Sequence, residues 1–326
     1  MLDGYGRHIN YLRLSVTDRC NLRCLYCVPA ERPDPIPEAE LLSASELEQV
    51  ARAAIEVGFA KVRLTGGEPL TRRDVVEVVT RLAGLPGMRE LVMTTNGLRL
   101  AELARPLFEA GLRRVNIHLD SLDRARAQRL MQLGAPDKVW AGILAAEQAG
   151  LTPIKLNMVV VRGHNEPDVV EMARLTRERE WHVRFIELMP IGAAAGFALE
   201  HYVSSQEVMA HIEATLGRLL PLNGGALVGE ARLYRLQDGR GTLGFISPVS
   251  NPYCASCDHM RVTADGQLRL CLLADQEIDL RQALRSGASH QELVRLFQQA
   301  IAAKPRGNHL QHGQLATKRA MIHIGG

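Results

Sequence analysis

The sequence predicts an α/β protein built on a partial, open (βα)6 barrel of the TIM-like kind, followed by a C-terminal α+β extension. In the first two thirds of the chain, a short apolar or β-branched run, a turn and a helical pattern repeat as one unit. Such alternation is typical of a parallel sheet. Six units are fewer than the eight that close a full barrel, so an open barrel is favoured over a flat doubly wound sheet.

The predicted elements follow in order along the chain. Six strands are expected, over residues 11–16, 61–64, 90–94, 114–119, 154–161 and 182–188. Helices are expected between them, over residues 43–57, 73–82, 100–110, 138–149 and 166–180. Ser43, with Glu46 three residues later, forms a capping box that marks the start of the first helix. Active groups are expected beyond the carboxyl ends of the strands.

The rhythm stops after Pro190. A helix is expected over residues 205–216, and a second region begins near Pro221. It contains short strands at 232–236 and 243–247, a turn at Asp265-Gly266, helices at 280–285 and 291–302, and a final stretch at 321–326. We therefore divide the chain into a core of residues 1–220 and a C-terminal domain of residues 221–326.

Composition excludes several classes of function. The net charge of +3 is too small to indicate a nucleic-acid or membrane partner. No run approaches the roughly 20 apolar residues of a membrane helix, and residues 1–11 lack the apolar core of a signal peptide. A cytoplasmic protein is expected. Thiols stay reduced there, so clustered cysteines indicate metal ligands or redox groups.

All six cysteines fall into two triplets at opposite ends of the chain. The first triplet is Cys20, Cys24 and Cys27, and the second triplet is Cys254, Cys257 and Cys271. Each supplies three thiolates where a closed metal site uses four. Three thiolates on a loop can hold three corners of a 4Fe-4S cluster and leave one iron for another ligand. A zinc loop or a group of buried cysteines is the simpler alternative.

Two further patterns carry chemistry. Thr65-Gly66-Gly67-Glu68-Pro69 follows the second strand, where glycines let backbone approach a ligand and a carboxylate can accept from a ligand ammonium. Taken alone, this motif also suits an ordinary strand-to-helix turn. Four cations lie on predicted strands and would converge inside a barrel, at a cost that a polyphosphate would relieve: Arg13, Arg63, Lys155 and Arg184.

The first triplet and the Gly-Gly-Glu-Pro motif together resemble the radical S-adenosylmethionine (SAM) superfamily. The complete set of motifs resembles one family within it, the GTP 3′,8-cyclases (molybdenum cofactor biosynthesis protein A), over essentially the whole chain. Besides both triplets and a terminal Gly-Gly, these motifs are Tyr-Leu-Arg13-Leu-Ser-Val-Thr-Asp-Arg-Cys20, Arg63-Leu-Thr-Gly-Gly-Glu-Pro69, Thr94-Thr-Asn-Gly97, Val115-Asn-Ile-His-Leu-Asp-Ser121, Lys155-Leu-Asn157 and Arg184-Phe-Ile-Glu-Leu-Met-Pro190.

The resemblance implies two 4Fe-4S clusters, with the extension carrying the second, and SAM as a further cofactor. The first triplet would hold the cluster that cleaves SAM to a 5′-deoxyadenosyl radical, and the second triplet a cluster whose open iron binds the guanine of GTP. The radical would take hydrogen from C3′ of GTP, and C3′ would then attack C8. The product would be (8S)-3′,8-cyclo-7,8-dihydroguanosine 5′-triphosphate, in the first step of molybdopterin synthesis.

The resemblance also implies roles for particular residues. SAM is expected near Tyr26, Gly67, Glu68, His118 and Met189. GTP is expected near Arg13, Arg63, Thr94, Lys155, His259, Met260 and Arg261. Catalytic roles are expected for Arg184, Arg261, Gly325 and Gly326. An external electron donor and, by pathway, the downstream cyclic pyranopterin monophosphate synthase are the implied partners of a monomer or homodimer.

Two positions depart from the family pattern. His259 stands where an arginine is usual, and His118 where a serine is common. His259 also raises the alternative of a Cys3His zinc site made with the second triplet. Two other functions are kept open: another radical SAM enzyme with an auxiliary cluster, acting on a peptide or small molecule, and a non-catalytic metal-binding protein.

Overall fold

The computed structural model describes residues 1–28, 34–132, 136–308 and 319–325. Six parallel strands follow one another as the sequence predicts: β1 (Tyr11–Ser15), β2 (Lys61–Thr65), β3 (Glu90–Thr95), β4 (Arg114–His118), β5 (Lys155–Val160) and β6 (His182–Glu187). The later strands are β7 (Leu219–Pro221), β8 (Leu227–Val228), β9 (Ala231–Leu236), β10 (Thr242–Ile246), β11 (His259–Val262), β12 (Gln267–Arg269) and β13 (Glu277–Asp279).

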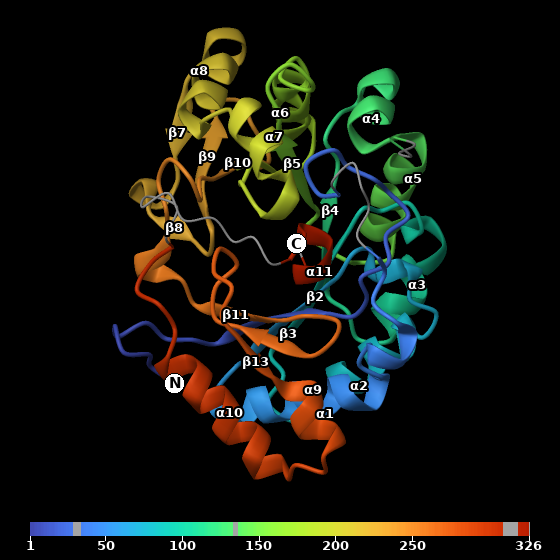
Figure 1. Ribbon diagram of the computed structural model, residues 1–326. Helices are drawn as coiled ribbons and strands as arrows, with labels where there is room; N and C mark the ends of the chain where they lie inside the picture. The colour runs from blue at the N-terminus through green and yellow to red at the C-terminus, as the bar shows by residue number, and fades with distance from the viewer. Residues whose placement is uncertain (29–33, 133–135, 309–318, 326) are drawn as a thin grey trace.

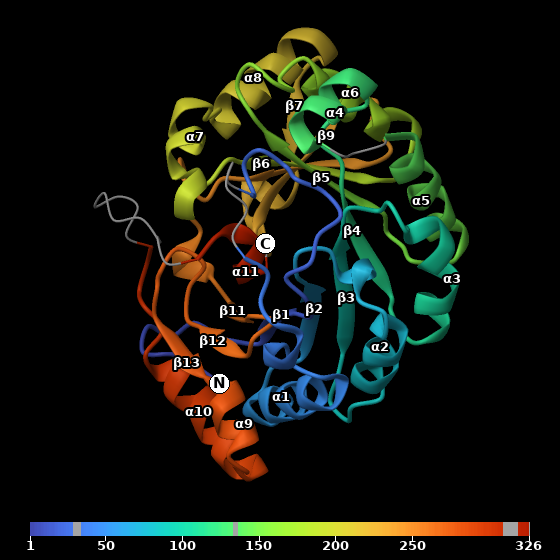
Figure 2. The ribbon, with the colours of Figure 1, turned by 45° about the vertical axis from the view of Figure 1, so that its right-hand side comes forward.

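The helices lie mainly outside the curved sheet (Figure 2). They are α1 (Ala44–Val57), α2 (Val75–Ala83), α3 (Leu100–Glu109), α4 (Arg124–Met131), α5 (Pro136–Gln148), α6 (Asp168–Glu178), α7 (Ala195–Glu200), α8 (Ser205–Leu216), α9 (Leu280–Arg285), α10 (His290–Ala302) and α11 (Met321–Ile324). Short 3-10 turns occur at η1 (Glu38–Glu40), η2 (Pro69–Thr71), η3 (Gly192–Ala194), η4 (Asn223–Gly225) and η5 (Cys254–Ser256).

The predicted α/β class with a parallel sheet is confirmed. The six strands and five intervening helices match their predicted ranges to within a residue or two at each end. The capping box of α1 is formed, because the Ser43 side chain accepts from the Glu46 backbone N–H and the Glu46 side chain accepts from the Ser43 N–H. Helix α4 was not predicted.

One continuous sheet runs in the order β13-β12-β11-β1-β2-β3-β4-β5-β6-β10-β9-β7, with β8 paired to β9. Strand β11 runs parallel to β1, and β10 runs parallel to β6. The C-terminal region therefore lengthens the parallel part of the barrel at both edges. Because the two regions share this sheet, the division near residue 220 stays a prediction.

The barrel has an apolar outside and a polar inside. Along β5, Leu156, Met158 and Val160 pack into the core, while Lys155 and Asn157 point to the other face. Registers bring Arg13 beside both Arg63 and Arg261, which continues the polar face around the sheet. Polar side chains that could contact a polar ligand therefore line the interior.

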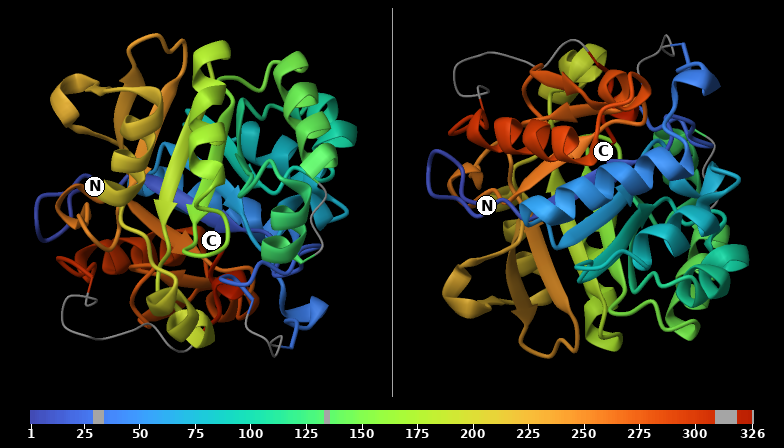
Figure 3. Two further views of the ribbon diagram at one scale, coloured as in Figure 1. Left: turned by 90° about the horizontal axis from the view of Figure 1, so that it is seen from above. Right: turned by 90° about the horizontal axis from the view of Figure 1, so that it is seen from below.

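The last described residues of the chain lie inside the barrel. Helix α11 lies at the centre of the curved sheet in two views (Figures 1 and 2), and Ile322 and Ile324 are buried. Just before it, Arg319 forms ion pairs with Asp265 at 3.0 Å and Glu277 at 2.8 Å. Outside the barrel, α10 packs beside α1 (Figure 3, right). Among the helices in the described ranges, none has the length and apolar character to cross a membrane.

Candidate active site

Two adjoining cavities occupy the barrel interior. The main cavity, about 230 Å³, is lined by the first triplet, by residues 65–68 and by Arg13, Arg184 and Glu230. The small cavity, about 60 Å³, is lined by the second triplet together with His259 and Lys304. Five residues line both: Met189, Pro248, Tyr253, Arg261 and Leu272. The two cavities thus adjoin at these five residues, and each is lined by one triplet.

The first triplet lies on the loop that leaves the carboxyl end of β1. The loop is fastened to the end of α4, because Arg23 N–H and Leu25 N–H donate to the carbonyls of Met131 and Leu130 at 3.0 Å. Burial, followed by neighbouring negative groups, raises the pKa of the Cys24 thiol well above its ordinary value and that of Cys27 to about 12. Thiols with this environment ionise when a metal replaces the proton.

The spacing of both triplets suits a cluster better than a closed zinc site. With Zn–S bonds near 2.3 Å, a tetrahedral site holds its donors roughly 3.8 Å apart. Within the described ranges, the potential ligand atoms gathered within 4.8 Å of one another belong to Cys24, His118 and Asp120, and neither complete triplet forms such a group. In each triplet, at least one pair of sulfurs is therefore more than 4.8 Å apart, which a 4Fe-4S cluster accommodates more readily than a single zinc ion. The residues therefore fit 4Fe-4S clusters.

The glycines after β2 have a structural reason that the sequence did not reveal. A Cβ at Gly67 would lie 2.4 Å from the carbonyl oxygen of Arg19, and one at Gly66 would lie 2.5 Å from that of Thr17. Gly67 N–H donates to the Thr17 carbonyl at 2.7 Å. The glycine pair thus lets this loop pack directly on the backbone that leads to Cys20, and it holds the Gly-Gly-Glu-Pro motif next to the loop of the first triplet.

Glu68 is 1% exposed and ties the ends of two strands together. Its carboxylate accepts from Leu70 N–H at 2.9 Å, Thr95 Oγ1 at 2.7 Å and Asn96 N–H at 2.6 Å. Burial raises its pKa, although these hydrogen bonds act in the opposite direction. The predicted acceptor of a ligand ammonium therefore borders the main cavity with protein donors already on both of its oxygens.

Tyr26 and His118 meet a third residue, Asp120, that the prediction did not include in the site. Tyr26 Oη donates to Asp120 Oδ2 at 2.6 Å, and His118 Nε2 lies 2.7 Å from the same oxygen. Burial works against a charged imidazole, but the charge of Asp120 outweighs it and raises the pKa of His118. Asp120 is fully buried and follows β4 by two residues. A polar residue just past a strand end was the available signal.

The four predicted cations do converge. Arg63 donates from Nε to Tyr11 Oη and from Nη1 to Thr94 Oγ1 at 3.0 Å. These hydrogen bonds connect the side chains of β1, β2 and β3. Burial and then Arg184 lower the pKa of Lys155 to about 6. Burial and then Arg63 lower the pKa of Arg184 to about 10. Burial and mutual repulsion together disfavour the charged forms of Lys155 and Arg184, and a bound anion would offset that cost.

Arg13 has a partner that sequence reasoning missed. Glu230 lies in the turn between β8 and β9, and its Oε1 accepts from Arg13 Nη1 at 3.1 Å. The same oxygen is 3.6 Å from His259 Nε2. Burial opposes ionisation, but these cations hold the pKa of Glu230 far below its ordinary range. A single acidic residue in a glycine-rich turn shows no sequence pattern that would predict its position inside the barrel.

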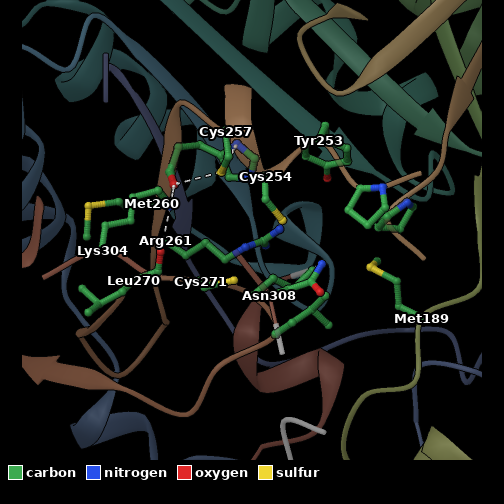
Figure 4. Close-up of a pocket in the computed structure, with 15 residues that line it drawn as sticks. Met189, Tyr253, Cys254, Cys257, Met260, Arg261, Leu270, Cys271, Lys304 and Asn308 are labelled. Carbon is green, nitrogen blue, oxygen red and sulfur yellow. Dashed lines mark hydrogen bonds between the residues drawn. The ribbon is translucent and has the colours of Figure 1, made fainter. Parts of the chain in front are cut away.

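Two basic residues support the second triplet. Lys304, 3% exposed, donates from Nζ to the carbonyls of His259 at 2.8 Å and Leu270 at 2.9 Å, as Figure 4 shows beside the three cysteines. Arg7 donates to the Cys254 carbonyl at 2.9 Å. Burial opposes ionisation of Cys257, yet His259 and then Lys304 lower its pKa to about 6. Neither Arg7 nor Lys304 was predicted.

Strand β11 carries three of the residues predicted for GTP, and their side chains lie on different faces of the strand. His259 and Arg261 share the interior face, whereas Met260 is 1% exposed and belongs to the apolar core, although it borders the small cavity. Arg261 donates from Nη1 to the Gly325 carbonyl at 2.8 Å. Gly325 therefore reaches the interior as expected, and Gly326 lies outside the described residues. Met189 lines both cavities.

Comparison with protein families fits this geometry. The model of the radical SAM superfamily matches residues 14–176, and the model called Molybdenum Cofactor Synthesis C matches residues 181–310. Two solved structures of SuiB from Streptococcus suis share the fold. The one bound to precursor peptide SuiA has a TM-score of 0.62 at 14% identity, covering 85% of this chain and 64% of that chain. The one bound to S-adenosylmethionine has a TM-score of 0.61 at 13% identity, covering 88% and 68%. The chain is thus a radical SAM protein.

Curated relatives narrow the class. The protein named GTP 3′,8-cyclase of Pelotomaculum thermopropionicum is 49% identical over 100% of both chains. The protein of that name from Moorella thermoacetica is 47% identical, again over 100% of both chains. The chain belongs to the GTP 3′,8-cyclase family.

Proposed function

We propose that the protein is a radical SAM GTP 3′,8-cyclase, which converts GTP to (8S)-3′,8-cyclo-7,8-dihydroguanosine 5′-triphosphate at the start of molybdenum cofactor biosynthesis. The observation that carries the proposal is the pair of adjoining cavities, each lined by one cysteine triplet, with cations among the lining residues. A radical source and a nucleotide anchor need such a shared space. A structural metal protein needs neither the cations nor the cavity.

Each triplet has a proposed occupant. Cys20, Cys24 and Cys27 would hold one 4Fe-4S cluster, and the second triplet another. When bound, the first cluster and SAM supply the 5′-deoxyadenosyl radical that takes hydrogen from C3′ of GTP. Tyr26, Gly67, Glu68, His118 and Met189 all line the main cavity and are proposed to surround SAM.

The proposed role of the interior cations is to hold the triphosphate. Arg63, Lys155 and Arg184 repel one another, so binding of a polyanion relieves a cost that the empty protein carries. Fixing the triphosphate also fixes the ribose, which brings C3′ and C8 into one geometry before reaction. Arg13, Thr94, His259 and Arg261 are proposed to complete the substrate site, with Met260 held in the core behind it.

The C-terminal tail is proposed to close the site. Ile324 is packed with Ile191 and Leu273, so α11 shields the interior from water, which would quench a reactive intermediate. Arg261 and Thr65 both donate to the Gly325 carbonyl. Gly325 and Gly326 are therefore proposed to act beside the substrate, together with Arg184 and Arg261.

An external electron donor and the downstream cyclic pyranopterin monophosphate synthase are the proposed partners. The protein would act as a monomer or homodimer. The six free thiols suit a reducing compartment, and we infer the cytoplasm.

An anaerobic assay tests the proposal. The reconstituted protein should carry about eight irons per chain and little zinc. With SAM and a reductant, it should form 5′-deoxyadenosine and the cyclic product from GTP, and it should not cyclise ATP. Cys24→Ala should abolish cleavage of SAM, whereas Cys257→Ala should retain cleavage and lose the cyclic product. About four irons with one tightly bound zinc, or turnover only with a peptide, would contradict the proposal.

A further inference from the structure

The interior charges are divided into a paired and an unpaired group. Arg13 forms an ion pair with Glu230, and His259 lies next to the same carboxylate. Among the described residues, Arg63, Lys155 and Arg184 have no carboxylate within ion-pair distance. Arg63, Lys155 and Arg184 lie on β2, β5 and β6, whereas Glu230 comes within 3.6 Å of His259 on β11, a residue that lines the small cavity with the second triplet.

The backbone delivers Glu230 to this place. Val228 pairs with Ala231, so Gly229 and Glu230 form a two-residue hairpin turn, with Gly229 at φ +65°. Acidic side chains at hairpin turns normally extend into water. The Glu230 side chain is only 18% exposed and instead lines the main cavity along with Tyr253, which faces both cavities.

A carboxylate at this position repels phosphate groups. The triphosphate is therefore expected at Arg63, Lys155 and Arg184, where no carboxylate of the described residues lies within ion-pair distance, whereas Glu230 is paired with Arg13. The end of the nucleotide that reaches Glu230 must offer hydrogen-bond donors, because an ionised carboxylate can only accept. Guanine offers two adjacent donors, N1–H and the 2-amino group, whereas adenine offers none at these two positions.

We propose that Glu230 is a specificity-determining residue that accepts a hydrogen bond from the 2-amino edge of guanine beside the second triplet. This inference rests on the proposed function and adds the residue that distinguishes guanine from other bases. Arg13 holds the carboxylate in place from the opposite side at 3.1 Å. A base that lacks the donor leaves a buried carboxylate under-satisfied, which makes rejection steep.

Equilibrium binding to the anaerobically reconstituted protein tests the inference, with SAM and reductant left out. The probes are GTP, inosine triphosphate (ITP), which lacks the 2-amino group, and inorganic tripolyphosphate. Wild type should bind GTP about tenfold or more tighter than ITP. Glu230→Gln should reduce that ratio several-fold, because a neutral amide oxygen accepts a hydrogen bond less strongly than a carboxylate, while tripolyphosphate binds equally well or tighter because a negative charge has gone.

Controls separate the possible failures. Glu180→Gln, at an exposed carboxylate near Arg240, should change none of the three affinities. Equal binding of GTP and ITP by wild type would overturn the inference even if the variant does not fold. The same holds if Glu230→Gln tightens all three probes equally, which would make Glu230 a counter-ion only. Absence of any cyclic product from wild type, by contrast, counts against the proposed function.

Discussion

Arg261 donates a hydrogen bond from Nη1 to the carbonyl oxygen of Gly325 at 2.8 Å. Arg261 lies on β11 and lines both cavities. Its hydrogen bond therefore ties Gly325, near the end of the chain, to the strand that follows Cys254 and Cys257. Burial and then Arg13 lower the pKa of Arg261 to about 9. The Gly325 carbonyl thus accepts a hydrogen bond from a buried guanidinium that lies near a second cation, Arg13.

Gly325→Ala is expected to lower GTP cyclisation by roughly tenfold or more while leaving iron content unchanged. A Cβ there would lie 2.7 Å from Thr65 Oγ1 and 2.8 Å from Ser15 Cβ, at a φ of +79°. The tail would have to move out of the barrel. Product formation per iron, measured by chromatography, checks this. Gly287→Ala is the matched control, because its φ is +83° and nothing lies within 4 Å. A normal turnover in Gly325→Ala would contradict the proposed tail role.

Gly67→Ala is expected to lose the first cluster and keep the second. Its Cβ would lie 2.4 Å from the Arg19 carbonyl oxygen, so the loop that carries Cys20 must shift. Iron analysis should give about half of the wild-type content, and cleavage of SAM should be lost. Gly196→Ala, where nothing lies within 4 Å of the added carbon, should behave as wild type. Full iron content in Gly67→Ala would show that the loop tolerates the shift.

Lys155 is expected to take up a proton when a polyphosphate binds. Its pKa in the ligand-free protein is about 6, so it is mostly neutral at pH 7.5, and a bound anion favours the charged form. Calorimetric titration with inorganic tripolyphosphate at pH 7.5, in two buffers of different ionisation enthalpy, should show up to about one proton more for wild type than for Lys155→Met. Equal uptake by both proteins would contradict this assignment.

The same residue should affect stability without ligand. The folded-state pKa of Lys155 lies below its ordinary value of 10.5, so the unfolded chain binds more protons between about pH 6 and 10.5. The contribution of Lys155 to the free energy of unfolding therefore rises with pH across that window. Lys155→Met should flatten this part of the profile in denaturant titrations.

Lys304→Met is expected to destabilise the C-terminal region by about 2 kcal/mol or more, because two buried carbonyls, of His259 and Leu270, lose a charged donor. Iron bound by the second triplet should fall, while cleavage of SAM continues. Urea unfolding and iron analysis measure the two effects. Lys138→Met, at an exposed position of α5, serves as the control. If both variants unfold alike and bind equal iron, the two hydrogen bonds do not support the triplet.

The parallel core could be predicted because its signals are local. Residues 61–65, for example, place the β-branched or apolar Val62 and Leu64 between polar residues, end at the turn Gly66-Gly67 and precede a helical pattern. Strands β10 and β11 could not be recognised as parallel members of the same sheet. Each is short, and other strands stand between it and its parallel neighbour along the chain, so only tertiary pairing with β6 and β1 reveals their place.

The same distinction applies to the site. Spacing alone identified Cys20, Cys24 and Cys27 as candidate ligands. Arg13 and Arg63 were identified because charged residues are unusual within predicted strands. Glu230, Lys304 and Arg7 reach the site from distant segments, and their neighbouring residues carry no chemical pattern. For Gly67, the residue was chosen correctly but its reason lies in the packing of one loop on another, which no single segment encodes.

The pairing of β11 with β1 and of β10 with β6 has a consequence for biosynthesis. During synthesis from the N-terminus, β1 to β6 emerge long before the strands that cover their outer edges. Until residue 246 has left the ribosome, both edges of the six-strand sheet are open, and the β1 edge stays open until residue 262 follows; open edges are templates for intermolecular pairing. The incomplete core is therefore expected to be most prone to intermolecular pairing before the final third of the chain arrives.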